Sequence, residues 1–575
     1  MLCTSNQLDQ VRFWHLSIYT LECHCEPVLL LITISPTNDI QLLQVIPMLP
    51  DILSQHLCSL QPCADRLAFS VLLTVRSSGE IKKTWFGRSI IRSCAKLSYD
   101  QALALLEHSH LPIHDPKMKE LAKLLPIPES PFRLTHVRDS LIKLNEIARN
   151  LRKQRIANGA LTLQKCKIEF DLPSATFDPD PTEFVDTDAI LHNRGTVWPR
   201  GYSVQAPSIS HQLIEEWMLA ANQAVARRLF AAYKDHLTTT KPHWPGALLR
   251  RHNPPSKEHI KEIANLLSSD GITLQDGSSR SISATLYRHN ERLIESGCSD
   301  KERKAVMDAL SHLIYLRMKM ATYFSLDDLL HTKSLSAKSV LSDPEAIFQH
   351  TWHYGLSVPL YTHFTSPIRR YADLLVHRQL DAILSQSSNR AASVRSHSTH
   401  LPLLRLAWKA AWCNNQRMMS RRAQEASQQL FLTACIRDCG PLRMDATVLD
   451  LTNSNIKVFL SDFGVIISCA LKKFMIHTQK WDVITIDRQD DSDASTSSSA
   501  GKQPGIAVIV ECDSETTQQP SSSDRTVSRK EFRCLSVIPC RVYSRNDRLV
   551  MHAEYFPNDD PSESDDMEHH DSVSP

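Results

Sequence analysis

The chain has 575 residues, 42% of them hydrophobic, and a formal net charge of +2. It is too long for one hydrophobic core, and its composition predicts a globular protein of two or three domains. A net charge this small excludes a basic surface spread over the whole chain, so any nucleic-acid surface must be a local channel.

Cysteine usage and the apolar runs exclude several other classes. The fifteen cysteines include no C-x-x-C pair, and the close pairs Cys23 with Cys25 and Cys435 with Cys439 lack a matching His/Cys half-site, which argues against zinc. Thiols scattered through apolar stretches are typical of a reducing compartment. The longest apolar run, 28–34, is far shorter than the ~20 residues of a membrane span, and no signal peptide precedes it. We expect a cytoplasmic protein with no membrane partner.

The first predicted elements are a hairpin and a helix. After a bend at 47–50 and a short helix at 52–60, residues 67–75 and 80–91 suit a β-hairpin that turns at Ser78 and Gly79. Ser98 is a good cap for the next helix and places Tyr99 at its start. From the residues alone, Tyr99 is expected to be a core tyrosine with its hydroxyl at the surface.

Two further predicted helices carry charged side chains. Residues 132–157 have apolar residues at helical spacing and end in a basic run that includes Arg152 and Arg155. Such a run is usually a solvated face near a helix C-terminus, and its alternative role is to line an RNA path. In the second helix, 210–233, Glu215 and Asn222 are seven residues apart and share one flank.

A polar, proline-dotted segment at 171–210 separates these helices and is predicted to be a loop insertion. It holds a cluster of acids, Asp178, Asp180, Glu183, Asp186 and Asp188. Their spacing is regular on neither a helix nor a strand, so we expect no metal site there.

The stretch PLYTHFTSPIRRYADLLVHRQL, residues 359–380, carries the strongest chemical signal. Ser366 is placed to cap a helix, and Pro367 suits its first position. Apolar residues then recur at spacings of three, four and seven, at Tyr371, Leu374, Leu375, Ile383 and Leu384. The pattern predicts a helix with one buried face.

Arg369 and Arg370 are out of place in the first turn of that helix, where cations are unfavourable by up to ~1 kcal/mol each. Two guanidinium forks beside free backbone N–H groups suit phosphate oxygens, which predicts an anion site. The alternative is that Asp373 neutralises both arginines, although an arginine placed before an aspartate is the poorer orientation for a helical pair.

The last part of the chain changes from helical to strand periodicity. Residues 401–435 predict long helices, whereas alternating runs at 443–451, 455–461, 464–471 and 482–486 predict strands. With later strand-like runs, they suggest a five-stranded OB barrel at 440–547. Segments rich in serine and acids at 490–505 and 513–524 are predicted flexible insertions, and 548–575 is predicted to be an acidic disordered tail.

The central stretch is one of several motifs that follow one another in a fixed order, VIPMLPDILSQHLCSL, DRLAFSV, WFGRSIIRSCAKLSYDQA, LIEEWMLAANQAVARRLF, ALLRRHNPPS and THFTSPIRRYADLLVHRQL. In this order they resemble the RNase II (RNB) family of 3′-to-5′ exoribonucleases. The resemblance implies an α+β fold, with an RNB-type catalytic domain of mixed sheet and many helices at 45–437, followed by a barrel like that of ribosomal protein S-one. Residues 1–44 match nothing in the family and are expected to form an atypical N-terminal segment.

The resemblance implies roles for individual residues. Arg369 and Arg370 are the candidates for holding the scissile phosphate, and either Glu215 or Glu216 faces the active site, where it holds a ribose or a metal-bound water. The implied RNA-binding residues are Tyr99, Arg152, Arg155, Ser366 and Asn222.

The resemblance also implies Mg²⁺, which the family holds with the aspartates of one D-x-x-x-x-x-D-x-D-D stretch to hydrolyse a phosphodiester. The sequence contains no such stretch, and SLDDLL at 325–330 lies too late in the chain to replace it. We expect the motif, together with the family's cold-shock domains, to belong upstream of Val45, so this chain supplies no metal ligand. The implied partner is single-stranded RNA, the implied state is a monomer, and the implied location is the cytoplasm, including P-bodies.

Three hypotheses about function follow. The chain is an N-terminally incomplete form of an active exoribonuclease that releases nucleoside monophosphates, a catalytically inactive relative that binds RNA, or a scaffold that keeps the fold as a surface for partners. The presence of Tyr99, Arg369 and Arg370 favours the first.

Overall fold

The computed structural model describes residues 2–4, 12–18, 39–41, 44–46, 48–112, 114–163, 167–171, 199, 201–205, 208–239, 246–269, 272–331, 343–387, 403–451, 455–470, 480–486, 505–513, 527–544 and 550–556. The helices are η1 Ile52–Leu57, α2 Tyr99–Glu107, α3 Pro116–Lys123, α4 Leu134–Ala157, α6 Ile209–Thr239, α7 Lys257–Ser269, α8 Ser279–Glu295, α9 Asp300–Leu316, α10 Leu326–His331, α12 Pro344–Thr351, η2 Tyr354–Leu356, α13 Tyr371–Ser387 and α14 Leu403–Cys439. Within the described ranges, no helix is both long and apolar enough to cross a membrane.

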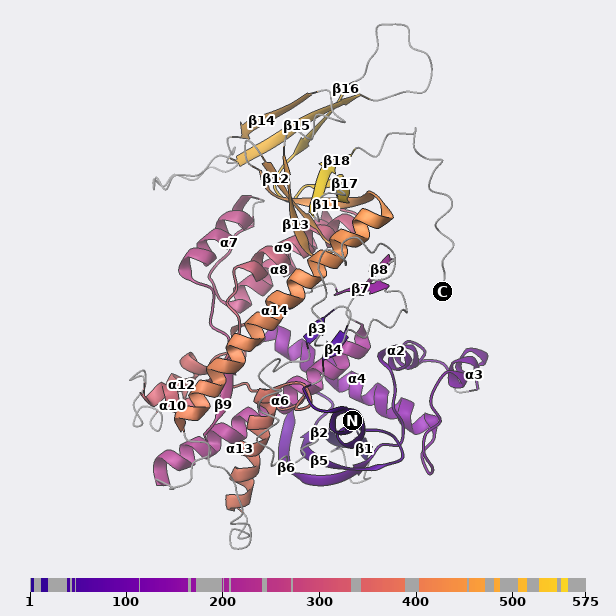
Figure 1. Cartoon of the computed structure of the whole chain (residues 1–575), viewed down its shortest axis with the longest axis vertical. Coiled ribbons are helices and arrows are strands. Elements are labelled where there is room, and N and C mark those ends of the chain that lie inside the picture. The colour runs from indigo at the N-terminus through magenta and orange to yellow at the C-terminus, as the bar shows by residue number, and fades with distance from the viewer. Residues whose placement is uncertain are drawn as a thin grey trace, which may run out of the picture.

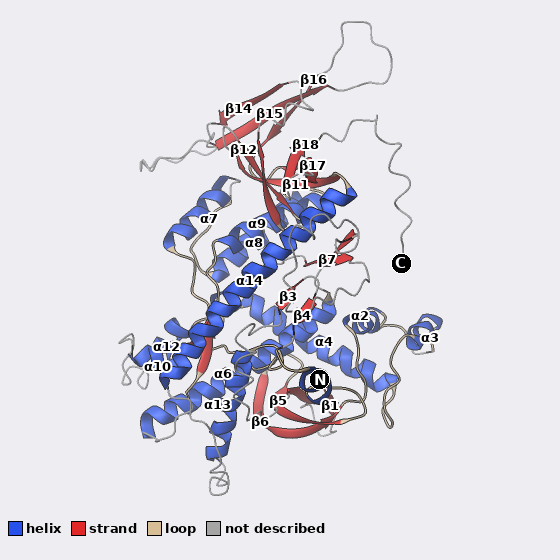
Figure 2. Ribbon diagram, viewed as in Figure 1, coloured by secondary structure: helices blue, strands red, loops and turns tan. Residues whose placement is uncertain are grey.

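Helices fill the middle of the molecule, between strands at its two ends (Figure 2). The helix α14 runs from the C-terminal strands toward α10 and α12, across much of that length (Figure 1). The prediction of a mixed α+β architecture is confirmed by this arrangement.

An antiparallel sheet lies near the N-terminus, with strand order β1 (Leu2–Thr4), β2 (Arg12–Ile18), β5 (Asp65–Val75) and β6 (Ile81–Arg92). Strands β5 and β6 form the predicted hairpin, and Gly79 in its turn has φ +92°, a conformation that suits glycine. Strand β2 pairs with β5, so part of the segment predicted to be atypical extends this sheet.

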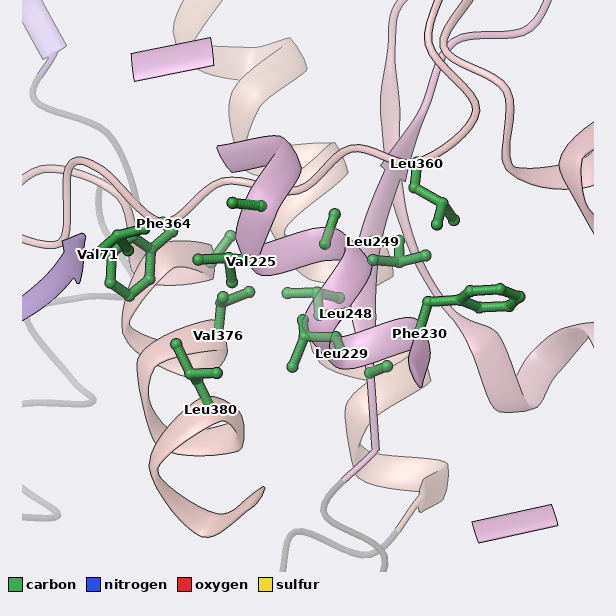
Figure 3. Packing of buried hydrophobic residues seen from close by; sticks show 14 of the residues in the cluster. Val71, Val225, Leu229, Phe230, Leu248, Leu249, Leu360, Phe364, Val376 and Leu380 are labelled. Atoms are coloured by element: carbon green, nitrogen blue, oxygen red, sulfur yellow. The ribbon is translucent and has the colours of Figure 1, made fainter. Parts of the chain in front are cut away.

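The largest hydrophobic core joins this sheet to α6, α13 and strand β9 (Leu248–Arg251). Their buried side chains point toward one another in Figure 3, among them Val71, Val225, Leu229, Leu248, Val376 and Leu380. The indole Nε1 of Trp217 in α6 donates to the Leu144 carbonyl of α4 at 3.2 Å, which fixes these two helices together. Both helices were predicted, and α6 continues past the predicted end to Thr239.

Strand β9 pairs with β10 (Thr322–Ser325), and α14 packs against β10. Asn414 of α14 accepts the Tyr323 N–H through Oδ1 at 2.7 Å and donates Nδ2 to the Tyr323 carbonyl at 2.9 Å. This side chain therefore completes the hydrogen bonding of an edge of β10.

The predicted insertion at 171–210 begins and ends in a short antiparallel pair, β7 (Lys167–Asp171) with β8 (Gly201–Gln205). Ile168 and Tyr202 pack against the C-terminal core. The acids predicted to form no metal site lie at 178–188, outside the described residues.

The C-terminal strands form a curled five-stranded sheet, consistent with an OB-like fold, with order β13 (Val465–Ala470), β12 (Asn455–Leu460), β11 (Leu442–Leu451), β17 (Val537–Ser544) and β18 (Met551–Tyr555). Two expectations are corrected here. The run at 482–486 belongs to a separate three-stranded sheet of β14 (Lys480–Ile486), β15 (Gly505–Asp513) and β16 (Val527–Phe532). The barrel was also predicted to end at residue 547. It extends further, because strand β18 at 551–555 pairs with β17.

The remaining strands, β3 (Asp39–Gln41) and β4 (Gln44–Ile46), form a two-stranded antiparallel pair. Most of the predicted flexible insertions, and residues 557–575 of the predicted tail, lie outside the described residues.

Candidate functional site

The loop at 358–370, between η2 and α13, carries the two arginines and is held by Asn222 of α6. The Oδ1 of Asn222 accepts the backbone N–H groups of Phe364 at 2.8 Å and Thr365 at 3.3 Å, and its Nδ2 donates to the Tyr361 hydroxyl at 3.1 Å. Asn222 is 2% exposed. It therefore positions the loop, and its predicted contact with RNA stays a prediction.

The helix after this loop begins later than predicted. It starts at Tyr371, with a turn at 367–369 before it, so the prediction of a helix that starts from Ser366 and Pro367 is wrong. The reason is Asp373, which is fully buried in the first turn and accepts the Ser366 backbone N–H at 2.7 Å. A carboxylate at this place suits the helix dipole and closes the loop onto the helix. Ser366 contributes its backbone to this closure, and its contact with RNA stays a prediction.

Only one of the two arginines is neutralised. The Nε and Nη2 of Arg370 each lie 2.8 Å from an oxygen of Asp373. Burial alone would lower the pKa of Arg370, but the Asp373 carboxylate raises it above its ordinary value. Arg369 is exposed and forms no ion pair with any residue that the structure describes. The alternative in which Asp373 neutralises both arginines is therefore wrong for Arg369.

An aromatic platform lies near Arg369. Tyr99, at the start of α2, is 47% exposed and stacks on His211 of α6, with ring centroids 3.9 Å apart and planes 9° from parallel. The predicted Ser98 cap is confirmed, because Ser98 accepts the Gln101 N–H at 3.1 Å. Partial burial and the charge of Arg370 lower the pKa of Arg369, whereas Asp373 and the nearby Tyr99 act in the opposite direction. An exposed ring beside a free guanidinium can bind a base and a phosphate of one nucleotide.

The other predicted charged residues pair with one another across α4 and α6. The Nε of Arg155 lies 3.2 Å from both carboxylate oxygens of Glu216, and Arg152 Nη1 lies 3.6 Å from Glu215 and from Glu216. The side chain of Glu216 is 3% exposed, whereas that of Glu215 is 48% exposed. Two arginines and two glutamates therefore form a balanced network, and their predicted catalytic and RNA-binding roles stay predictions.

Three residues near the loop had no role assigned from the sequence. His211 had no signal, because a single histidine in an amphipathic helix is ordinary. Arg250 lies in ALLRRHNPPS, one of the motifs that resemble the RNB family. The resemblance drew attention to this motif but implied no role for Arg250. Arg417 is one of several arginines of α14, and its sequence context does not show which of them faces the loop.

The residues near Arg369 do not fit the Mg²⁺ that the resemblance implies. Among the described residues, no three His, Cys, Asp or Glu side chains converge into a group that could hold a metal ion. Asp373, the carboxylate that closes the loop at 358–370 onto α13, is buried and already bonded to Arg370 and Ser366. The described residues there therefore offer cations that suit an anion, but they do not supply a metal centre.

Comparisons with known proteins identify relatives over most of the chain. A family model described as the RNB domain matches residues 42–386. DIS3-like exonuclease 2 of Xenopus tropicalis is 34% identical over 422 residues, a match that covers 73% of this chain and 42% of that protein. A protein named inactive exonuclease DIS3L2, of Arabidopsis thaliana, is 29% identical over 73% of this chain and 37% of its own length. The chain thus spans about two fifths of the length of these relatives.

Two solved structures share the fold. RNase R of Mycoplasma genitalium, in complex with ribose methylated single-stranded RNA, matches with a TM-score of 0.59 at 15% identity, over 96% of this chain and 68% of that one. Yeast Ssd1, described as a pseudonuclease, matches with a TM-score of 0.60 at 17% identity, over 96% of this chain and 65% of its own.

Proposed function

Since the chain belongs to the family of RNB-domain proteins, we propose that it is the RNA-holding part of a 3′-to-5′ exoribonuclease that acts on single-stranded RNA. The resemblance found in the sequence motifs is confirmed by the family model and by the DIS3-like exonuclease 2 relatives. We include in this proposal Mg²⁺ as the cofactor of hydrolysis, nucleoside monophosphates as products, a monomeric state, and a cytoplasmic location that includes P-bodies.

The observation that carries this proposal is the exposed guanidinium of Arg369, which has no ion-pair partner among the described residues and lies on a loop fixed by its neighbours. Asn222 and Asp373 hold the backbone around it, and Arg370 satisfies Asp373. The guanidinium of Arg369 is therefore free to donate two parallel hydrogen bonds to a phosphate. Because the loop is already ordered, binding a developing negative charge requires little reorganisation.

Tyr99 supplies the second contact. Its ring is half exposed and is supported on one face by His211, so its other face can take a base. Stacking is tolerant of sequence, because every base has a π-face, and this suits an enzyme that shortens RNA one nucleotide at a time. The described residues would hold and orient the RNA in this scheme, and Mg²⁺, which would activate water for hydrolysis, would be held by carboxylates outside them.

A second candidate function is that of an inactive RNA-binding relative. It is favoured by the absence of a D-x-x-x-x-x-D-x-D-D stretch from the sequence and of a metal-ligand group from the described residues. Two of the similar proteins are themselves described as inactive or as a pseudonuclease.

The test is the incubation of the purified 575-residue chain with labelled single-stranded RNA and Mg²⁺, with binding and hydrolysis followed in parallel. We expect an affinity for RNA that falls as salt rises, and no release of mononucleotides. Failure to bind RNA at low salt would overturn the proposed function. Release of mononucleotides would show that this chain carries its own metal ligands and would exclude the inactive alternative.

A further inference from the structure

One unusual charged group in the described structure is Arg250, in β9. It is 5% exposed, and its guanidinium carbon lies 4.8 Å from the centroid of the Tyr323 ring. Its side chain makes no hydrogen bond or ion pair with any described residue, and Nη1 is fully buried without a partner. A buried cation with unsatisfied donors is unfavourable, because both its charge and its N–H groups have lost water.

The charges around Arg250 make its burial still less favourable. Burial lowers the pKa of Arg250 most. The positive charges of its neighbours Arg417 and Arg370 also lower this pKa. Asp373, in the first turn of α13, is engaged by Arg370. The polar groups that remain near Arg250 are the hydroxyls of Tyr323 and Tyr361 and the ring of His363, and burial lowers the pKa of His363 well below its ordinary value.

Three elements bring these cations to the loop that carries Arg369. The backbone N–H of Arg250 donates to the Tyr361 carbonyl at 2.8 Å, which joins β9 to the loop. The Tyr323 hydroxyl, beside the Arg250 guanidinium, lies 2.6 Å from His363 Nδ1 in the same loop. Asn414 of α14 bonds the Tyr323 backbone. Arg417 lies three residues later, about one turn further along the same helix.

We propose that Arg250 and Arg417 form a second phosphate-binding site, which takes a phosphate group of the RNA strand held at Arg369. This inference rests on the proposed function and adds two residues to it. A phosphate oxygen accepts several hydrogen bonds and carries the negative charge that this cluster lacks. RNA is the favoured source, because a strand that stacks on Tyr99 and reaches Arg369 brings further phosphates on either side.

The experiment measures the affinity of the 575-residue chain for a short single-stranded RNA over a range of salt concentrations. The variants are Arg250→Gln, Arg250→Lys and Arg417→Gln. The matched control is Arg251→Gln, because Arg251 is the next residue of β9, lies over the Phe324 ring and donates to the His350 carbonyl. Thermal melting of each variant identifies any that fails to fold.

We expect Arg250→Gln to weaken binding roughly 10-fold or more. The slope of log affinity against log salt should become shallower by about 0.7, which is the change for one phosphate contact to a single strand. Arg417 is partly exposed, so Arg417→Gln is expected to fold and should make the salt slope shallower as well. This variant tests the site even if Arg250→Gln does not fold. Arg250→Lys should keep most of the salt slope, and Arg251→Gln should change neither quantity.

An affinity loss with an unchanged salt slope in both glutamine variants would show that the arginines act only on the fold, and would overturn the second site. Normal RNA binding by both variants would also overturn it, and would point to a protein carboxylate as the partner of Arg250. If the unmodified chain binds no RNA at all, it is the proposed function that fails, so the two failures are distinct.

Discussion

Two groups of charged side chains lie close to the same helix, α6, and they differ in charge balance. The first, between α4 and α6, pairs Arg152 and Arg155 with Glu215 and Glu216. The second, around the loop at 358–370, contains four arginines, Arg250, Arg369, Arg370 and Arg417, but its one described carboxylate, Asp373, is bonded to Arg370.

In our proposal, charge balance rather than residue type separates a structural network from a ligand site. A buried pair whose charges and hydrogen bonds are matched needs nothing further, whereas unmatched guanidiniums need an anion. From the sequence, both groups were candidates for the site. The contacts distinguish them and lead to predictions that separate effects on stability from effects on RNA.

The largest expected effect lies in the balanced network. Replacing Glu216 with alanine leaves buried Arg155 with only the half-exposed Glu215 as an acidic partner, so the free energy of unfolding should fall by up to about 3–5 kcal/mol. Urea denaturation measures this loss. The double variant Arg155→Met with Glu216→Met is the control and should recover most of the stability, because no unpaired charge remains. A Glu216→Ala protein with normal stability but impaired RNA processing would show instead that Glu216 belongs to the active site.

In the unbalanced cluster, the expected effect is on turnover. In a nuclease-active form of the protein, Arg369→Lys should lower turnover by ~10²-fold or more with RNA affinity and stability nearly unchanged, because lysine keeps the charge but loses the two-pronged donor. Single-turnover kinetics measures the effect. Arg370→Lys is the neighbouring control, and it should reduce stability more than turnover because it weakens the pair with buried Asp373. Equal, small effects at both positions would contradict a role for Arg369 in holding phosphate.

The aromatic platform should contribute to affinity alone. Tyr99→Ala should weaken RNA binding by ~1–3 kcal/mol, the contribution of one stacked base. Tyr99→Phe should bind normally, because the ring is what stacks. Fluorescence anisotropy with labelled RNA measures both variants. Equal binding by all three proteins would place Tyr99 outside the RNA path and bring back the alternative of a structural tyrosine.

The loop should also respond to mild acid. Burial lowers the pKa of His377 to about 4, and its Nε2 donates to the Phe364 carbonyl at 2.7 Å. The unfolded chain takes up this proton near pH ~6.5, before the folded chain does, so stability should decrease as pH falls from ~6.5 toward ~4. At pH ~5.5 the loss is about 1.4 kcal/mol. Thermal melting at several pH values measures this loss of stability. A His377→Gln variant whose stability decreases with pH as steeply as that of the unmodified protein would contradict the assignment to His377.

Much of the fold followed from local signals in the sequence. The hairpin of β5 and β6 and the helices α4 and α6 have periodic apolar residues, and Ser98 supplies a clear helix start. The start of α13 was misplaced because Ser366 and Pro367 satisfy local rules for a helix start. Asp373 instead bonds the Ser366 backbone, a contact that propensity does not encode.

The candidate residues were named from the sequence, but their pairing was not. Arg369 and Arg370 are adjacent and chemically identical, and only the fold decides that Arg370 reaches Asp373. Likewise, the pairing of Arg155 with Glu216 joins residues 61 apart in sequence. Arg250 received no role, because the absence of a partner around a buried side chain becomes visible only when its surroundings are known.

The hydrogen bonds of Asn222 also bear on the order in which the chain folds. They join α6 to residues 139 to 143 positions away in the sequence. Contacts of such long range close large loops, and they form slowly because the entropy of closure is lost before the contact is gained. The local helix α6 can therefore form well before the loop acquires its shape. A chain still being synthesised should not capture RNA at Arg369 until the residues up to α13 have emerged and docked, so the ability to bind RNA should arrive well after the first helices have formed.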